Sequence, residues 1–311
     1  MRSAEPQNVA PPAPDAGQAR LMRAATYASV GVATTLIAAK FSAWMMTDSV
    51  ALLSTLIDSF LDVAASLVNL MAVHHSLQPA DRDHRFGHGK AEPLAGLGQA
   101  AFIGGSGVFL LLQAGERLAH PRAVDNTTVG LAVMGLSILL TLVLVLFQKS
   151  VVKRTGSVAV AADSLHYQTD LLVNASVAVS LVLVAQFGWG VADPLFALAI
   201  VAYILHGAWK IGRDSLDHLM DREMPEADRL NIRELVVGHP GVIGMHDLRT
   251  RLAGMRAFVQ LHLEMPGHLT LAEAHEIAEQ VMYKIEAAYP NAEVLIHEDP
   301  QGVQERRVVF R

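Results

Sequence analysis

The stretch Ser157–Asp170, SVAVAADSLHYQTD, decides the fold of this chain when it is read beside Ser49–Asp62, SVALLSTLIDSFLD. Both stretches belong to segments that are long and apolar enough to cross a membrane. Each carries two potential metal ligands four residues apart, a spacing that places both side chains on one face of a helix. These ligands are Asp58, Asp62, His166 and Asp170. Facing each other, the two pairs supply three carboxylates and one imidazole, a four-ligand shell for a divalent ion. Ionisable groups at membrane depth are costly and normally serve a function.

The two stretches are also related as a repeat. A shift of 108 residues aligns Asp58 with His166 and Asp62 with Asp170, and it matches the T-x-S-V-A pattern that precedes both pairs. The segments lie three spans apart and cross the membrane in opposite directions, as in an inverted repeat with its site near the midplane. At ~1.5 Å per residue the ligands lie ~14–20 Å deep, about half the membrane. A helix cap or a snorkelling group explains one such residue, but not two pairs in register.

Composition limits the class of protein. Of the 311 residues 52% are hydrophobic and only 17% are charged, below the ~25% of soluble proteins. The net charge of −6 argues against a nucleic-acid partner. The absence of cysteine excludes disulfides, thiolate metal sites and thiol catalysis, so any metal must be held by carboxylates and by some of the 14 histidines.

Six apolar segments follow an amino-terminal tail, and each reaches or approaches the ~20 residues that a span needs. They are Ala24–Trp44, Val50–Val73, Leu94–Leu112, Val129–Phe147, Val158–Phe187 and Val191–Trp209. Short connections such as Met45–Ser49 and Gly188–Gly190 make neighbouring spans antiparallel. The sequence therefore predicts an all-α, six-helix transmembrane domain over residues 20–213. The tail, residues 1–19, contains PPAP, lacks a signal-peptide pattern, and is expected to be disordered.

Lysine and arginine near the span ends orient the bundle. Ten of them fall on one side: Arg20, Arg23, Arg82, Arg85, Lys90, Lys149, Lys153, Arg154, Lys210 and Arg213. Only Arg117 and Arg122 fall in loops on the other side. The positively charged side is cytoplasmic, which places both termini inside. Trp44 and Trp189 fall at the outer boundary, as interface anchors do, and Lys40 is expected to snorkel outward.

After about Asp214 the pattern becomes that of a soluble α+β domain. Residues 226–237 and 270–288 are expected to be helices, the second with Thr270 and Glu273 as a capping box. Residues 242–251, 257–264 and 292–297 are expected to be strands, the first two joined by a turn at Gly254. The order α-β-β-α-β indicates a small two-layer domain over residues 214–300, followed by an extension, 301–311.

Further potential metal ligands lie outside the spans. Between the second and third spans, Asp81, His84 and His88 either clamp one ion or form an ordinary solvated turn. In the soluble domain a larger set falls on or beside neighbouring strands and predicts one or two bound ions. This set is His246, His262, His297 and Asp299. His275 opens a motif that resembles a zinc-protease helix, but Glu279 stands where the second histidine would be. His275 therefore belongs to an exposed helical face or joins the neighbouring cluster.

Several longer motifs resemble one family. The segments DSFLD, SLQPADRDHRFGHGKAE, ADSLHYQTD, LMDRE, HDLRTR, QLHLEM and IHEDP are similar, in this order, to the cation diffusion facilitators, and most closely to their bacterial ferrous-iron and zinc efflux members. The resemblance covers about Arg20 to Pro300. The departures are a longer, proline-rich amino-terminal tail and the short extension after Pro300.

The resemblance implies a homodimer in the bacterial cytoplasmic membrane, with six spans per protomer and a metallochaperone-like cytoplasmic domain. It implies export of a divalent metal in exchange for protons. The transport site would be Asp58, Asp62, His166 and Asp170; the loop site would be Asp81, His84 and His88. A cytoplasmic site holding structural or regulatory zinc would use His246, His262, His275, His297 and Asp299. Lys90 and Asp221 match a charged interlock near the membrane surface.

The expected chemistry follows from the ligand types. Three carboxylates and one imidazole suit Zn²⁺ or Cd²⁺, although Fe²⁺ and Mn²⁺ accept the same ligands. Ligation needs deprotonated side chains, so metal and protons compete and alternating access yields antiport. Asp163, one helical turn before His166, is expected to be a partner of the ligands or a proton relay. Two rival classes are an intramembrane metalloenzyme and a membrane-bound metal sensor, neither of which would move metal across sealed vesicles.

Overall fold

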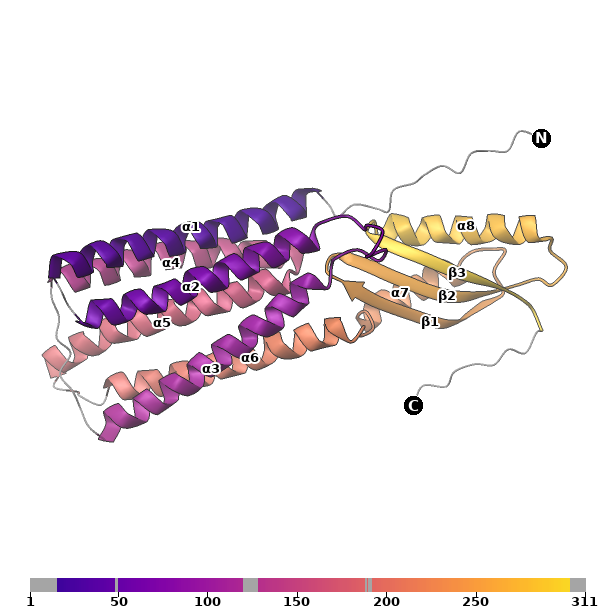
Figure 1. Cartoon of the computed structure of the whole chain (residues 1–311). Helices are drawn as coiled ribbons and strands as arrows, with labels where there is room; N and C mark the ends of the chain where they lie inside the picture. Colours follow the sequence, from indigo (N-terminus) through magenta and orange to yellow (C-terminus); the bar gives the residue numbers. More distant parts are fainter. Residues whose placement is uncertain (1–15, 48–49, 120–127, 188, 190–191, 303–311) are drawn as a thin grey trace. The chain divides into compact units, whose positions relative to one another are not determined.

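A computed structural model of the protein describes residues 16–47, 50–119, 128–187, 189 and 192–302. In the amino-terminal part of these residues, six long helices lie side by side as a bundle (Figure 1). They are α1 (Ala16–Thr47), α2 (Val50–Ser76), α3 (Ala91–Ala119), α4 (Thr128–Thr155), α5 (Val158–Phe187) and α6 (Ala192–Leu219). Apolar stretches long enough to cross a membrane occur in α1, α2, α3, α4 and α6. The predicted helical domain is confirmed.

The helices extend beyond the predicted apolar spans. Helix α1 begins at Ala16, inside the stretch that was expected to be disordered, and α6 continues ten residues past Trp209. Hydropathy marks only the apolar part of a helix, whereas its internal hydrogen bonds continue wherever good helix formers follow. Arg117, expected in a loop, lies in the last turn of α3. The predictions for residues 1–15 and 303–311, and for Ser49 and Arg122, lie outside the described residues.

Helix α5 packs against several neighbours at once. It lies against α2, α3 and α4, and Leu165 joins Ile103 of α3 and Ile204 of α6 in a buried apolar cluster. The hydroxyl of Tyr167, which is almost fully buried, shares a hydrogen bond of 2.8 Å with Ser66 of α2. Tyr167 and the neighbouring polar residues Asp163 and His166 of α5 are therefore buried inside the bundle.

The remaining described residues form an α+β domain in the predicted order. Its elements are α7 (Glu226–Val237), β1 (Gly244–Ala253), β2 (Arg256–Met265), α8 (Leu271–Ala288) and β3 (Ala292–Pro300). The described strands pair in the order β1-β2-β3, with β1 antiparallel and β3 parallel to β2. Strand β3 runs three residues beyond the predicted end, so Asp299 lies within the strand.

The two faces of this sheet differ in character. Val259, Leu261 and Leu263 of β2 point into a core completed by buried residues of α7 and α8, such as Ile232 and Val281. Because successive side chains of a strand alternate between faces, His262 lies on the opposite face. The helices thus cover one side of the sheet, and the histidines line the other.

Helix α8 begins with the predicted capping box. Thr270 accepts a hydrogen bond from the backbone N–H of Glu273 at 3.4 Å, and Glu273 accepts one from the backbone N–H of Thr270 at 2.8 Å. The second bond holds the pKa of Glu273 below its usual range. The capping box fixes where α8 starts against the sheet.

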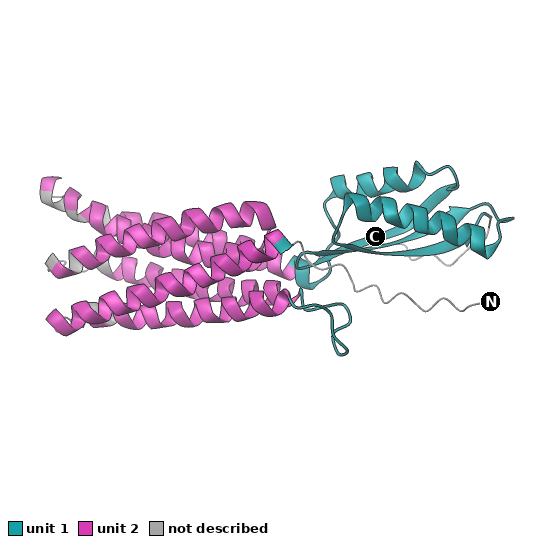
Figure 2. Cartoon of the chain, turned by 90° about the horizontal axis from the view of Figure 1, so that it is seen from above, with its two compact units in different colours: residues 1–16, 78–89, 217–311 teal, residues 17–77, 90–216 magenta. Residues whose placement is uncertain are grey.

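The chain divides into two compact units (Figure 2). Residues 17–77 and 90–216 form the helical unit, and the loop 78–89 belongs with the α+β unit. In that loop Phe86 lies 5.9 Å from Phe258 between ring centroids, and Arg251 stacks on both rings. Gly89 meets the hairpin so closely that an added Cβ would lie 2.1 Å from the carbonyl oxygen of Ala253. A glycine is therefore required where the loop meets the β1–β2 turn.

Candidate metal sites

A cavity of about 730 Å³ lies within the helical unit and is lined by residues from each of its six described helices. Four of its lining residues are the ligands predicted from the sequence: Asp58, Asp62, His166 and Asp170. The cavity is largely apolar elsewhere, with Phe102 and Ile103 among its walls. The polar groups of the predicted site thus converge on one space inside the bundle.

Three of the four predicted ligands approach one another closely. The Nε2 atom of His166 lies 3.0 Å from Oδ1 of Asp62 and 3.8 Å from Oδ2 of Asp170. One ligand atom from each residue falls within a 4.8 Å group. Phe102 and Tyr167 pack edge-on against the imidazole, which is only 8% exposed. Asp58 lines the same cavity one helical turn before Asp62 but is more exposed and stands outside this group.

A fully buried carboxylate, that of Asp163, lies one turn before His166. Asp163, 1% exposed, accepts hydrogen bonds from Ser29 of α1 at 2.5 Å, Gln148 of α4 at 2.7 Å and Gln99 of α3 at 3.3 Å. Gln148 also donates to Ser29. A single side chain of α5 therefore ties together three other helices.

Lys40 does not point away from the bundle, and the prediction that it snorkels outward is wrong. Its Nζ donates to Oγ of Ser59 at 2.6 Å and to the backbone oxygen of Thr55 at 3.3 Å, both on α2. An ammonium at this depth gains hydrogen-bond acceptors and nearby carboxylates by turning inward, and Lys40 lines the cavity.

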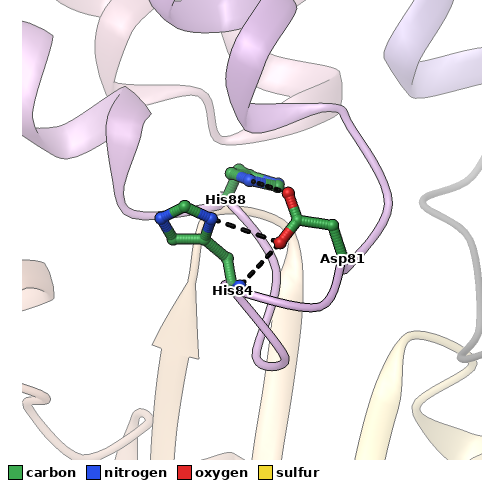
Figure 3. Close-up of side chains that lie close together, drawn as sticks. All are labelled: Asp81, His84 and His88. Carbon is green, nitrogen blue, oxygen red and sulfur yellow. Dashed lines mark hydrogen bonds and ion pairs between the residues drawn. The ribbon is translucent and has the colours of Figure 1, made fainter.

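The loop between α2 and α3 brings its three predicted ligands together (Figure 3). Nδ1 of His84 lies 3.3 Å from Oδ1 of Asp81, and Nε2 of His88 lies 3.2 Å from Oδ2. The backbone N–H of His84 donates to the carboxylate at 2.6 Å and holds the pKa of Asp81 below its usual range. The stability that this ionised, hydrogen-bonded carboxylate adds to the fold is fully present above the ordinary pKa of aspartate. It is lost only as the pH falls through the lowered pKa of Asp81. Asp81 is therefore ionised, and able to bind a cation, throughout the neutral and mildly acidic range.

The third set of ligands crosses the sheet. His246 pairs in register with His262, which pairs in register with His297, so the three imidazoles form a row across β1, β2 and β3. The carboxylate of Asp299, 7% exposed, lies 3.3 Å, 2.9 Å and 3.2 Å from a ring nitrogen of these three histidines. A bulge in β1 after His246, with Asp247 at a φ of 50°, bends the strand beside this row.

Two further predicted residues lie apart from these groups. His275 of α8 lies 3.6 Å from Glu279 and 3.8 Å from Glu298, so its place in the strand cluster stays a prediction. Asp221 forms an ion pair with Arg251 at 3.1 Å. Lys90 belongs to the helical unit and Asp221 to the α+β unit, and the interlock between them also stays a prediction.

Comparison with known proteins decides the family. Residues 26–220 match the cation efflux transmembrane domain, and residues 224–301 match the cytoplasmic domain of cation efflux proteins. The chain belongs to the cation diffusion facilitator family. It is 48% identical over 283 residues to the cation-efflux pump FieF of Shewanella oneidensis, covering 91% of this chain and 95% of that protein. It is 46% identical over 289 residues to FieF of Yersinia pestis strain Pestoides F, covering 93% and 96%. A solved structure of the zinc form of CzrB, with 32% identity and a TM-score of 0.25, covers 28% of this chain and 100% of that chain.

As a cation diffusion facilitator of the FieF type, this protein is a multi-pass membrane transporter that exports metal cations and is not an enzyme. Sequence reasoning about this facilitator missed two features of its bundle: the inward direction of Lys40 and the partners of Asp163. One feature of the sequence could have indicated the partners of Asp163: single polar residues within apolar spans, as at Ser29, Gln99 and Gln148. Such residues rarely occur in spans without a polar partner.

Asp299 should matter more to the strand cluster than any exposed carboxylate of the same strand. Asp299→Ala removes the group that contacts all three imidazoles, so we expect metal affinity of this cluster to fall roughly tenfold or more. Chelator competition on the full-length facilitator measures this change, with Glu293→Ala as the control because Glu293 is a half-exposed carboxylate of β3. Reduced transport at low metal should accompany the loss; unchanged binding would remove Asp299 from the site.

Proposed function

We propose that this chain exports Zn²⁺, and also Cd²⁺ or Fe²⁺, from the bacterial cytoplasm by metal/proton antiport with alternating access. The transported ion would be held by Asp58, Asp62, His166 and Asp170. The loop site and the cytoplasmic site would bind further metal that regulates or stabilises the transporter.

The observation that carries this proposal is the group formed by Asp62, His166 and Asp170 inside the cavity. Ligand atoms from two helices fall within 4.8 Å of one another, in a space that also admits Asp58. One imidazole and several carboxylates match the preferences of Zn²⁺ and Cd²⁺, and the absence of thiolates makes copper(I) an unsuitable cargo.

Proton coupling follows from the same ligands. A metal binds only the deprotonated carboxylates and the neutral imidazole, so each ion that enters displaces protons. Alternate exposure of the cavity to a near-neutral cytoplasm and to a more acidic exterior would therefore load metal on one side and release it on the other. The inverted repeat of α2 and α5 supports a site that both sides can reach.

The homodimer and the orientation belong to the same proposal. Residues 224–301 match the cytoplasmic domain of cation efflux proteins, a domain named ZT_dimer, and this match supports association of two copies. The excess of lysine and arginine on the side of the bundle where both termini lie supports cytoplasmic termini. We propose residues 20–213 as the transport domain and 214–300 as the metal-binding domain, joined by the Lys90–Asp221 interlock.

Metal flux into sealed inside-out vesicles tests the proposal. Zn²⁺ uptake should depend on a proton gradient directed from the vesicle lumen to the medium. Each Zn²⁺ that enters should be accompanied by release of protons into the medium. Competition among Zn²⁺, Cd²⁺, Fe²⁺ and Mn²⁺ would rank the cargo. Uptake of Zn²⁺ without any proton movement would refute antiport, and absence of uptake of all four ions would refute the transport assignment.

His166 should set the choice of ion. His166→Asp replaces the imidazole by oxygen ligands, which suit Mn²⁺ better and Zn²⁺ or Cd²⁺ less. We expect the ratio of Zn²⁺ to Mn²⁺ flux to fall on the order of tenfold, with a shifted pH profile because a fourth anion is added. His206→Asp is the matched control, since His206 lies on α6 and does not line the cavity. An unchanged flux ratio in His166→Asp would show that His166 is not a ligand.

A further inference from the structure

Lys40 is a cation directed into the cavity by two hydrogen bonds. The side chain leaves α1 and its Nζ reaches Ser59 Oγ at 2.6 Å and the backbone oxygen of Thr55 at 3.3 Å. Ser59 and the predicted ligand Asp58 both belong to α2 and both line the cavity, so the ammonium is anchored in the space that the ligand faces. The half-buried Lys40 lines the same cavity as the four ligands.

The ammonium acts electrostatically on both ends of the site. It shares one cavity with the carboxylate of Asp58 on α2 and with that of Asp170 on α5, and opposite charges in one partly buried space attract each other. Among the described residues that line the cavity, the ionisable acids and bases are Lys40, Asp58, Asp62, His166, Tyr167 and Asp170. With neutral His166 and Tyr167 and ionised carboxylates, as metal ligation requires, three negative charges and one positive charge leave a net charge of minus two.

We infer that Lys40 is the fixed counter-charge of the transport cavity, which matches the net charge of the metal-ready site to one divalent cation and keeps that cation from being held too tightly. The inference rests on the proposed function, because it takes Asp58, Asp62, His166 and Asp170 as the ligands. Lys40 is thus a residue that tunes affinity and release without binding the metal.

Loss of this charge has a defined direction. Without the ammonium the deprotonated site carries three uncompensated negative charges, so a divalent ion binds more tightly and leaves more slowly. Charges that share one partly buried cavity interact strongly enough to change affinity by on the order of tenfold. We therefore expect tighter binding together with slower maximal transport.

Zinc flux in proteoliposomes, measured against Zn²⁺ concentration at one pH and ionic strength, tests the inference on the full-length protein. Lys40→Gln removes the charge but keeps a donor for Ser59, and Lys40→Arg keeps the charge. We expect the half-saturating Zn²⁺ concentration of Lys40→Gln to fall about tenfold and its maximal flux to fall severalfold. Lys40→Arg should stay within about twofold of the unaltered protein on both measures.

Two more variants separate charge from packing. Ser59→Ala removes one of the two acceptors but leaves the charge and the backbone oxygen of Thr55, so its half-saturating Zn²⁺ concentration should fall less than that of Lys40→Gln; a merely structural contact between α1 and α2 would make the two variants alike. Lys40→Met is a second neutral variant in case Lys40→Gln does not yield a monodisperse dimer. The inference is overturned if the neutral variant has an unchanged or higher half-saturating concentration, or if Lys40→Arg behaves as Lys40→Gln does.

Asp62→Ala distinguishes this failure from failure of the proposed function. If Asp62→Ala still transports Zn²⁺ normally, the assigned transport site is wrong and the inference falls with it. If Asp62→Ala transports no Zn²⁺ and Lys40→Gln matches the unaltered protein, the assigned transport site stands. Only the inference about Lys40 is then overturned.

Discussion

Asp62→Ala and Asp170→Ala are each expected to abolish metal-driven flux, with a reduction of more than about 100-fold, while the protein still assembles. Each carboxylate lies within 4 Å of His166 Nε2, and a four-ligand site that loses one anion in a cavity of low dielectric loses most of its attraction for a divalent ion. Folding should persist, since a partly buried carboxylate without its ion costs stability and its removal relieves that cost.

Flux into vesicles, with the amount of reconstituted protein determined in parallel, measures this loss. Ser106→Ala is the matched control because Ser106 of α3 lines the same cavity but offers neither a carboxylate nor an imidazole. The control should keep most of its flux. Near-normal transport by Asp62→Ala or Asp170→Ala would remove that residue from the site.

Asp163→Ala is expected to damage the fold of the helical unit more than any other single truncation of a polar side chain there. It removes the acceptor of Ser29, Gln99 and Gln148, all of them buried. A buried donor left without an acceptor costs about 1–3 kcal/mol, and the bond that remains between Gln148 and Ser29 offsets part of this. We expect a loss of roughly 2–4 kcal/mol, visible as a lower Tm in detergent and a lower yield of monodisperse protein.

Asp163→Asn provides the comparison. The amide has nearly the same volume and keeps one acceptor oxygen, so it should retain more of the thermal stability than alanine does. An alanine variant as stable as the unaltered protein would show that the three donors find other partners. If asparagine preserved stability but lost transport, the negative charge of Asp163 itself would be needed in the transport cycle.

Periodicity and hydropathy predicted most of the architecture, because the features concerned are local. Six apolar segments were enough to predict six helices, and the capping box of Thr270 and Glu273 predicted where α8 begins. The ends of α1 and α6 could not be predicted in this way, since the polar residues that continue these helices resemble those of a loop in composition. The four cavity-lining residues that we propose as ligands could be named because their spacing repeats along the chain.

The directions of single polar side chains depended on contacts that no local pattern contains. Asp163 and Ser29 are separated by 134 residues, and their bond follows from how α1 packs beside α5. Lys40 turns inward because Ser59 and Thr55 of the neighbouring helix offer acceptors within its reach. Depth in the membrane indicated that such residues have partners, and only the packing of the helices shows which partners they are.

Because side chains alternate along β2 and β3, odd-numbered and even-numbered residues of each strand lie on opposite faces of the sheet. In β2 the odd positions, such as Leu261, build the core, and in β3 the even positions, such as Ile296, do so. The histidines and Asp299 occupy the other parity. Stability and the chemistry of the proposed metal site can therefore be changed separately in the same strand. A substitution such as His262→Asp alters the donor atoms on the open face without touching the core, so the proposed site could change its preferred ion while the fold stays the same.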